Sequence, residues 1–293
     1  YNQGMANRPE AEIDITQDLV QALLDDQFPE LVNLTLRELS RGWDNTNLLL
    51  GDAAIVRVPH RQIAARLIAH EQAWLPALAT QIDLPISAPT HAGTPTDFFP
   101  WPWSVTPFFP GTEAATTPLV DAAHTAATLA SFFRQVHTPA PPDAPTNKYR
   151  GCPLAHRAQS FTTHLNQLDA SLDRQRIAAI FEEACTVEQT NERVWLHGDL
   201  HTRNMIASDG DLAAVIDWGD ICAGDRATDL AGAFMLVPNE LAVVQQHAGA
   251  DDDAWQRARG WAANFAVIYL AHSDDDPVMA GIGLRLLDTL LTT

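Results

Sequence analysis

Lysine is the scarcest charged residue in this chain, with Lys148 as its only occurrence. The 293 residues include 37 acidic side chains and 18 lysine or arginine side chains, which gives a formal net charge of −19. A protein this acidic is repelled by nucleic acids and by anionic membrane surfaces, so neither is an expected partner. A small cationic ligand would be attracted instead.

Cysteine and long apolar stretches are also scarce. Cys152, Cys185 and Cys222 are odd in number and have no Cys-x-x-Cys spacing, which argues against a disulfide framework or a zinc site. No apolar run approaches the roughly 20 residues of a membrane span, and no basic-then-apolar start suggests export. These absences predict a cytoplasmic protein with reduced thiols, long enough for one large domain or two lobes.

The most informative stretch is residues 194–220. Val194–Leu196 is a short apolar run and predicts a buried strand that ends in a polar loop. Met205–Ala207 and Leu212–Ile216 are two further apolar runs, and the Ser-Asp-Gly-Asp at 208–211 between them is strong turn chemistry. These two runs therefore predict a β-hairpin that returns the chain toward its starting end.

Three polar residues are brought together by this hairpin. Asp217 ends its second strand, Asn204 precedes its first strand, and Asp199 lies in the loop before it. Magnesium takes oxygen ligands and is usually held by one or two protein groups plus substrate phosphates, so Asn204 and Asp217 are the expected metal ligands. Asp199 is then free of the metal and is expected to accept the proton of an attacking hydroxyl, as in phosphoryl transfer. The alternative for each residue is an ordinary turn or capping role.

Other polar residues of this region have supporting roles. His197, at a strand end, is expected to brace the loop by hydrogen bonds. Asp229 lies near the start of a predicted helix and is expected to brace the same loop by accepting backbone hydrogen bonds. Asp220 is either a partner of the metal site that could also contact the acceptor, or a simple turn residue.

The motif itself resembles that of a known family. His197-Gly-Asp-Leu-His-x-x-Asn204, followed by Ile216-Asp-Trp218, is similar to the aminoglycoside phosphotransferase family of kinase-like enzymes. In protein kinases an Arg directly precedes the catalytic Asp, and the metal-binding Asp is the first residue of an Asp-Phe-Gly motif. Here Gly198 and Trp218 stand in those places, which favours the small-molecule branch. The resemblance covers about residues 34–291. In the expected small lobe, the chain is most similar to the macrolide phosphotransferases of this family.

The resemblance implies an α+β fold of the two-lobed protein-kinase type. We expect a small antiparallel-sheet lobe at residues 5–105 that binds nucleotide, and a larger, mainly helical lobe at 106–293 that holds the catalytic and substrate-binding residues. Nucleotide and metals are expected between them. The sequence patterns place strands at 31–39, 46–50, 53–58 and 84–89, an extended connection at 98–111, and helices at 17–27, 61–79, 117–137, 154–168, 172–187, 226–236, 240–247, 254–271 and 277–291.

Nucleotide contacts follow from the same resemblance. The family places a Lys in an early strand to pair with phosphates, and this chain has no lysine there. Arg57 takes that position in an apolar strand, where a guanidinium can fork onto phosphate oxygens. The sequence Arg57-Val-Pro59 is also similar to macrolide phosphotransferases. Glu71 on the next helix is the expected ion-pair partner of Arg57. The alternatives are a solvated Arg57 and a surface Glu71.

Two further positions are assigned to the nucleotide. Asn45 lies in the loop at 42–47, which would cover phosphates although it lacks Gly-x-Gly-x-x-Gly; the alternative is an ordinary hairpin. Trp103 lies in the connection rich in proline and aromatics, where it would help form a slot for the base. Its alternative is a packing role in a core.

Three functions fit these observations. The first is an antibiotic-type phosphotransferase that uses Mg²⁺ and ATP or GTP to modify a hydroxyl of an aminoglycoside or macrolide, which would make it a resistance enzyme. The second is a metabolic kinase acting on a sugar, an amino alcohol or an amino acid. The third is a non-catalytic kinase-like binding module. A monomer or a homodimer fits each of them.

Acidic clusters near the end of the chain suggest a cationic acceptor. Residues 240–293 contain eight acidic and three basic side chains. Asp274 and Asp275, in the cluster 274–276, could bind the amines of such an acceptor. Acids at these positions could equally cap helix N-termini, where they face the positive end of the helix dipole.

Overall fold

The computed structural model describes residues 10–292. The described chain forms two compact units. Unit 1 contains the described part of residues 1–81 together with Pro85–Pro110 and Asp217–Gly219; unit 2 contains Ile82–Leu84, Gly111–Ile216 and the chain from Asp220 onward. Residues 5–9, which open the predicted first lobe, lie outside the described residues. The functional division at residues 105 and 106 stays a prediction.

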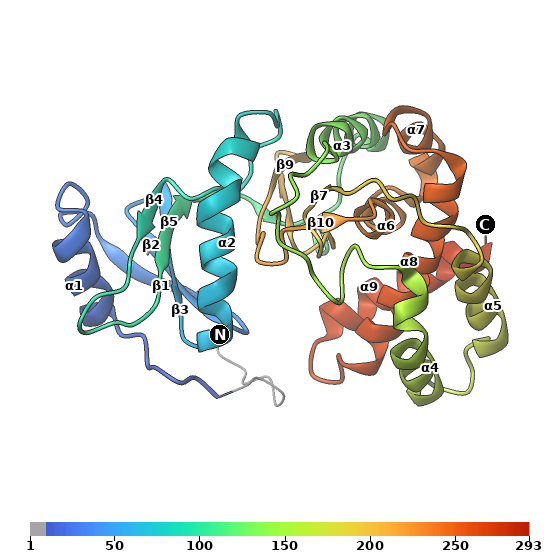
Figure 1. The fold of residues 1–293 in the computed structure, drawn as a ribbon, viewed down its shortest axis with the longest axis horizontal. Coiled ribbons are helices and arrows are strands. Elements are labelled where there is room, and N and C mark those ends of the chain that lie inside the picture. The colour runs from blue at the N-terminus through green and yellow to red at the C-terminus, as the bar shows by residue number, and fades with distance from the viewer. Residues whose placement is uncertain (1–9, 293) are drawn as a thin grey trace. The chain divides into compact units, whose positions relative to one another are not determined.

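Unit 1 is an antiparallel sheet with two helices (Figure 1). The five strands are arranged in the order β1-β2-β3-β5-β4. Its elements are α1 (Gln17–Gln27), β1 (Leu36–Arg41), β2 (Asn45–Leu50), β3 (Ala54–Pro59), α2 (Gln62–Ala79), β4 (His91–Gly93) and β5 (Trp103–Pro107). The predicted cap of α1 is confirmed, since the Thr16 side chain accepts a hydrogen bond from the Leu19 N–H.

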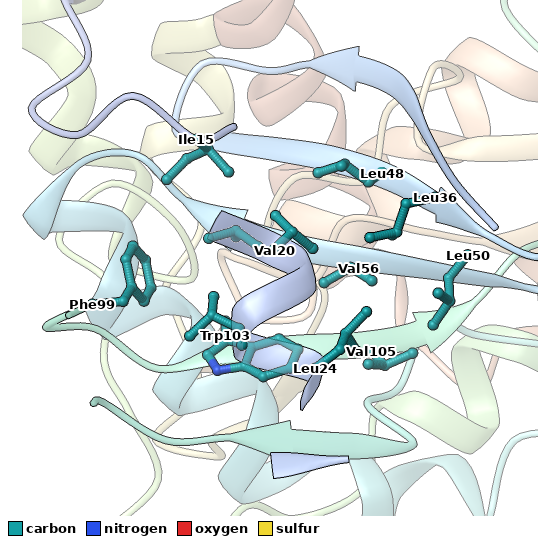
Figure 2. Close-up of a cluster of buried hydrophobic side chains, with 12 residues drawn as sticks. Ile15, Val20, Leu24, Leu36, Leu48, Leu50, Val56, Phe99, Trp103 and Val105 are labelled. Atoms are coloured by element: carbon teal, nitrogen blue, oxygen red, sulfur yellow. The ribbon is translucent and has the colours of Figure 1, made fainter. Parts of the chain in front are cut away.

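Alternation along β3 explains how this sheet positions a functional side chain. Val56 and Val58 are buried in the hydrophobic cluster that also contains α1 (Figure 2). Arg57, between them, points to the opposite face and reaches Glu71 of α2, because successive side chains of a strand alternate between its faces. The buried cluster on the α1 side comprises Ile15, Val20, Leu23, Leu24, Leu36, Leu48, Leu50, Val56, Val58, Phe99, Trp103 and Val105.

Two strand predictions and one predicted connection need correction. The strand predicted at 31–39 begins only at Leu36, because the preceding residues form turns, with Leu31 donating to the Phe28 carbonyl. No strand element spans 84–89, and β4 follows it at His91–Gly93 instead. The predicted connection at 98–111 contains β5, a full member of the sheet that pairs with β3 and β4.

Unit 2 is mainly helical (Figure 1), and it contains the predicted hairpin as β8 and β9. Helix α8 is its centre, buried along most of its length and packed against α4, α5, α6 and α9. The elements are β6 (Thr112–Glu113), α3 (Ala122–Val136), η1 (Leu154–Arg157), α4 (Ala158–Gln167), α5 (Arg174–Cys185), β7 (Val194–Leu196), β8 (Met205–Ser208), β9 (Asp211–Val215), β10 (Cys222–Gly224), α6 (Ala227–Leu236), η2 (Pro238–Glu240), α7 (Leu241–His247), α8 (Asp252–Ala271) and α9 (Pro277–Thr292).

The start of α3 was predicted too early. The helix begins after Asp121, whose side chain accepts a hydrogen bond from the His124 N–H, rather than after Thr117. Asp is among the best N-cap residues, whereas the Thr117 hydroxyl pairs with that of Thr112. Within residues 10–292, no single helix is long and apolar enough to cross a bilayer, and only the bent pair of α6 with residues 238–247 passes that test jointly.

Candidate active site

In unit 1 the predicted chemistry gathers around Arg57. Its Nη1 lies 2.7 Å from the Glu71 Oε2, and its Nη2 lies 3.1 Å from the Asp217 Oδ1. Arg57 is 8% exposed and Glu71 is fully buried. The predicted ion pair is therefore confirmed, and the alternatives of a solvated arginine and a surface glutamate are wrong.

Charge is not balanced in this group. Burial lowers the pKa of Arg57, but Glu71 and Asp217 outweigh it and raise that pKa overall, so the guanidinium stays charged. Burial raises the pKa of Glu71 to about 7, although Arg57 opposes the shift. One cation thus faces two carboxyl groups, and Glu71 Oε1 has no hydrogen-bond partner among the described residues. Asp217 has a side chain that is 59% exposed, so it remains accessible to a further cation.

The two other nucleotide predictions have different surroundings. Asn45 opens β2 directly after the β1–β2 turn, where its carbonyl accepts the Gly42 N–H. Its side-chain Oδ1 is buried and has no partner within residues 10–292. The Trp103 indole is fully buried and packs edge-on against Phe28. For the Trp103 ring the structure therefore favours the packing alternative over a slot for a base.

In unit 2, Asp229 fixes the loop after β7. Its two carboxylate oxygens accept the backbone N–H groups of His197 and Gly198, at 2.8 and 2.9 Å. Asp229 lies in the first turn of α6 and is fully buried. The predicted bracing role is confirmed. Gly198 has a φ of +89°, and a Cβ there would lie 2.5 Å from the Asp220 carbonyl oxygen, so this turn requires glycine.

His197 also braces this loop, as predicted. Its Nδ1 accepts the Asp199 N–H at 3.2 Å. Nδ1 is therefore unprotonated, and Nε2 carries the hydrogen and donates to the Ile216 carbonyl at 2.9 Å. The ring thus joins the loop to the end of β9 and serves no proton-transfer role in this arrangement.

Asp199 is held by two basic side chains. Arg150 Nη2 lies 2.8 Å from its Oδ1, and His201 Nε2 lies 3.4 Å from its Oδ2. Burial would raise the pKa of Asp199, but Arg150 and His201 outweigh burial and hold that pKa well below its usual range. Asp199 is therefore ionised, and its weak basicity favours orienting a hydroxyl over removing its proton early.

Arg150 was missed by the sequence interpretation. It lies 49 residues before Asp199, at the end of a loop that the sequence marks only as rich in proline. One signal was available: no Asp or Glu occurs between Asp143 and Asp169, in a chain that is otherwise strongly acidic.

The predicted magnesium ligands have suitable donor atoms. The Asn204 Nδ2 donates to the Asp199 carbonyl at 2.9 Å, which orients the amide and leaves its oxygen as the atom that a cation could contact. The Ile216 N–H donates to the Asn204 carbonyl at 2.9 Å, immediately before Asp217. No group of three or more His, Cys, Asp or Glu residues that could hold a metal occurs within the described chain. An amide oxygen and a carboxylate are each the kind of ligand that magnesium takes.

The acidic clusters mostly serve the fold. Asp251 caps α8 through the Ala254 N–H, and Asp276 accepts the Met279 N–H at the start of α9. Asp276 also pairs with Arg203, in the loop between β7 and β8. The capping alternative thus holds for these two residues. Of the other acidic candidates, Asp274 is exposed and Asp275 is half-buried. The Asp220 carboxylate accepts a hydrogen bond from the Asn147 side chain at 2.7 Å.

The class of the protein follows from fold and motif together. An antiparallel-sheet unit, a helical unit and the Asp199, Asn204 and Asp217 set define a kinase-like α+β fold. The sequence model of the phosphotransferase enzyme family matches residues 35–261, so the chain belongs to that family. The resemblance seen in the sequence is confirmed. No curated protein matches the sequence significantly.

Several solved structures share the fold. The GDP complex of wild-type aminoglycoside 2'-phosphotransferase-IIIa has a TM-score of 0.68 and 18% identity, over 95% of this chain and 99% of that one. The streptomycin-ATP-APH(2")-IIa ternary complex has a TM-score of 0.59 and 17% identity, over 96% and 97%. Macrolide 2'-phosphotransferase MphH from Brachybacterium faecium has a TM-score of 0.59 and 20% identity, over 91% and 98%. At these identities the likeness establishes the fold.

Proposed function

We propose that this protein transfers the γ-phosphate of a nucleoside triphosphate to a hydroxyl of a small molecule. The observation that carries the proposal is Asp199: an ionised carboxylate on a loop clamped by Asp229, with its carbonyl bonded to the candidate metal ligand Asn204. A non-catalytic binding module would not need this combination.

Each residue has a definite part in the proposed reaction. The acceptor hydroxyl donates a hydrogen bond to Asp199, which aims its oxygen at the γ-phosphorus. As the new O–P bond forms, the bond to the β-phosphate oxygen breaks, the nucleoside diphosphate leaves, and the hydroxyl proton passes to Asp199. Arg57 binds phosphate oxygens and is positioned by Glu71. Mg²⁺ held by Asn204 and Asp217 would neutralise phosphate charge.

The donor is a purine nucleotide in this proposal. Support comes from the relatives that share the fold, whose structures were solved with GDP or with ATP. Asn45 has a buried amide oxygen without a partner in the described chain and is available to the donor. ATP and GTP should therefore both be tested.

Two acceptor classes remain. An antibiotic acceptor is supported by the kanamycin and streptomycin complexes of proteins with this fold. A metabolic acceptor is supported by Arg150, because a cation beside Asp199 would oppose an incoming amine. The deciding experiment is a phosphorylation screen with ATP and GTP against both classes, read by mass spectrometry of the product.

Transfer should require magnesium through Asp217. We expect Asp217→Ala to weaken Mg²⁺-dependent nucleotide binding about ten- to hundredfold, since a charged ligand to the cation is lost. Calorimetric titration of nucleotide with and without Mg²⁺ measures this directly. Asp52→Ala is the matched control, since Asp52 is fully exposed at the β2–β3 turn of the same unit. Equal magnesium dependence in Asp217→Ala and the parent would remove Asp217 from the metal site.

Arg57 should contribute to binding of the donor. Arg57→Ala should raise the nucleotide KM about ten- to hundredfold, which is the scale of a lost charged hydrogen bond. Arg57→Lys should restore only part of the nucleotide affinity, because a lysine ammonium cannot bind two phosphate oxygens in the bidentate geometry of a guanidinium. Steady-state kinetics on the folded variants provides the measurement. Arg37→Ala, which removes an exposed arginine from β1 of the same unit, is the control. An unchanged KM in Arg57→Ala would assign Arg57 to the fold alone.

A further inference from the structure

Three basic residues lie close together in the chain, and one of them, Arg150, contacts the proposed catalytic carboxylate of Asp199. We call Lys148, Arg150 and Arg157 the basic cluster. It includes the only lysine of the chain, and it occupies the stretch between Asp143 and Asp169 that has no acidic residue. The overall charge of −19 therefore conceals a local charge of the opposite sign.

Aromatic rings hold the cluster together. Lys148 Nζ lies 4.6 Å from the centre of the Tyr149 ring, and the Arg157 guanidinium carbon lies 5.2 Å from it. Arg150 stacks over Phe265 of α8, with its guanidinium carbon 5.1 Å from the ring centre. Rings attract cations but carry no net charge, so these contacts fix the cations without neutralising them.

Few carboxylates oppose these cations. Within residues 10–292, Lys148 and Arg157 form no ion pair, whereas Arg150 faces Asp199 and, at 3.9 Å, Asp220. Three cations against two carboxylates leave a net charge of +1. Burial lowers the pKa of Arg157, and the positive charge of Arg150 contributes to that shift, so the two guanidinium groups are within electrostatic range of each other.

Unused donors point to an anion. Arg150 gives Asp199 one hydrogen bond through Nη2, while its buried Nε lies 3.9 Å from the Asp220 carboxylate and has no hydrogen-bond partner within residues 10–292. The Arg157 Nε is likewise buried without a partner in the described chain. Buried donors left unpaired cost free energy, and an oxyanion is the ligand that satisfies guanidinium donors best.

We infer that the acceptor carries a carboxylate or phosphate group near its reacting hydroxyl, and that Arg150 binds this group with help from Lys148 and Arg157. The inference rests on the proposed function, because it concerns the acceptor of that reaction. An amine would meet Arg150 at the same place. The expected substrate class is therefore a hydroxy acid, a sugar acid or a phosphorylated alcohol rather than an aminoglycoside.

The test compares acceptors of similar size that differ in charge through one substituted group. Glucuronate, glucose and glucosamine form one set; glycerate, glycerol and serinol form a second; glycerol phosphate adds a phosphate member, and kanamycin and erythromycin represent antibiotics. Transfer from ATP or GTP is followed by kcat/KM. We expect the anionic member of at least one set to exceed its neutral analogue about ten- to hundredfold. The carboxylate and phosphate members distinguish the two anions.

Variants test the assignment to residues. Lys148→Gln and Arg157→Gln should each reduce kcat/KM several-fold for the anionic acceptor and so lower the ratio of its kcat/KM to that of the neutral analogue. Arg150→Gln should abolish the preference, and Arg150→Lys should restore part of it. Arg176→Gln is the matched control, because it removes an exposed arginine from α5 of the same unit. Lys148 is exposed, so its variant keeps the test valid if Arg150→Gln does not fold.

Several results would overturn the inference. Preference for neutral or cationic acceptors would refute it and leave the proposed function intact. Nucleotide hydrolysis that depends on Asp199, without phosphate transfer to any anionic acceptor, would also refute the inference and leave the proposed function intact. An equal loss of kcat for all acceptors in Arg150→Gln would make Arg150 a general support of Asp199. Failure of every acceptor, with hydrolysis equal in the parent and Asp199→Ala, would refute the proposed function itself.

Discussion

Asp199→Ala is expected to reduce phosphoryl transfer by about 10³- to 10⁴-fold, near the upper range for loss of one acid–base group. The variant removes the group that orients the acceptor hydroxyl and accepts its proton. Nucleotide affinity should change by no more than about threefold, because the Asp199 carboxylate is paired with Arg150 and His201 and is proposed to contact the acceptor rather than the nucleotide.

Two further variants make this measurement specific. Asp199→Asn keeps the size of the side chain and loses its charge, so it should be nearly as inactive as Asp199→Ala. Asp211→Asn makes the same change at an exposed position of β9 and should be fully active. Thermal unfolding should be recorded in parallel, since removing Asp199 leaves Arg150 without its closest partner. Turnover within tenfold of the parent would exclude Asp199 as the base or orienting group.

Spacing explains why much of this region was predictable. Two short apolar runs around a Ser-Asp-Gly-Asp turn allow few alternatives to a hairpin, and β8 and β9 form one. A carboxylate in the first turn of a helix can accept backbone N–H groups from a neighbouring loop, and Asp229 does so. Arg57 stands between two buried valines on one strand, which directs it to the opposite face. Local patterns were enough in each case.

Other features depend on contacts that are distant in sequence. Arg150 reaches Asp199 across 49 residues, and no local pattern links them. Trp103 lies among prolines typical of a connection, yet hydrogen bonding to β3 and β4 makes its segment a strand. Net charge predicts a cationic acceptor, whereas the basic cluster favours an anionic one, because a sum over the chain contains no information on where the few basic residues gather.

Asp229→Ala should cause the largest loss of stability among these variants. Asp229 is fully buried, and it accepts the N–H groups of His197 and Gly198. Alanine leaves both donors buried without an acceptor, at about 1–3 kcal/mol each. We therefore expect the free energy of unfolding to fall by about 2–6 kcal/mol. Urea unfolding, followed by circular dichroism, measures that change.

A comparison of three variants isolates this clamp from simpler effects. Asp229→Asn keeps one acceptor oxygen, but its amide NH₂ would face the second N–H, so its loss of stability should be about half as large. Asp121→Ala removes an exposed carboxylate that accepts only the His124 N–H at the start of α3, and should cost about 1 kcal/mol. Because the clamp fixes the backbone next to Asp199, both Asp229 variants should also lose kcat under conditions where they remain folded, while Asp121→Ala keeps it. A stable Asp229→Ala with normal kcat would mean that the loop holds its shape through His197 alone, with its bonds to Asp199 and Ile216 sufficient to position the carboxylate.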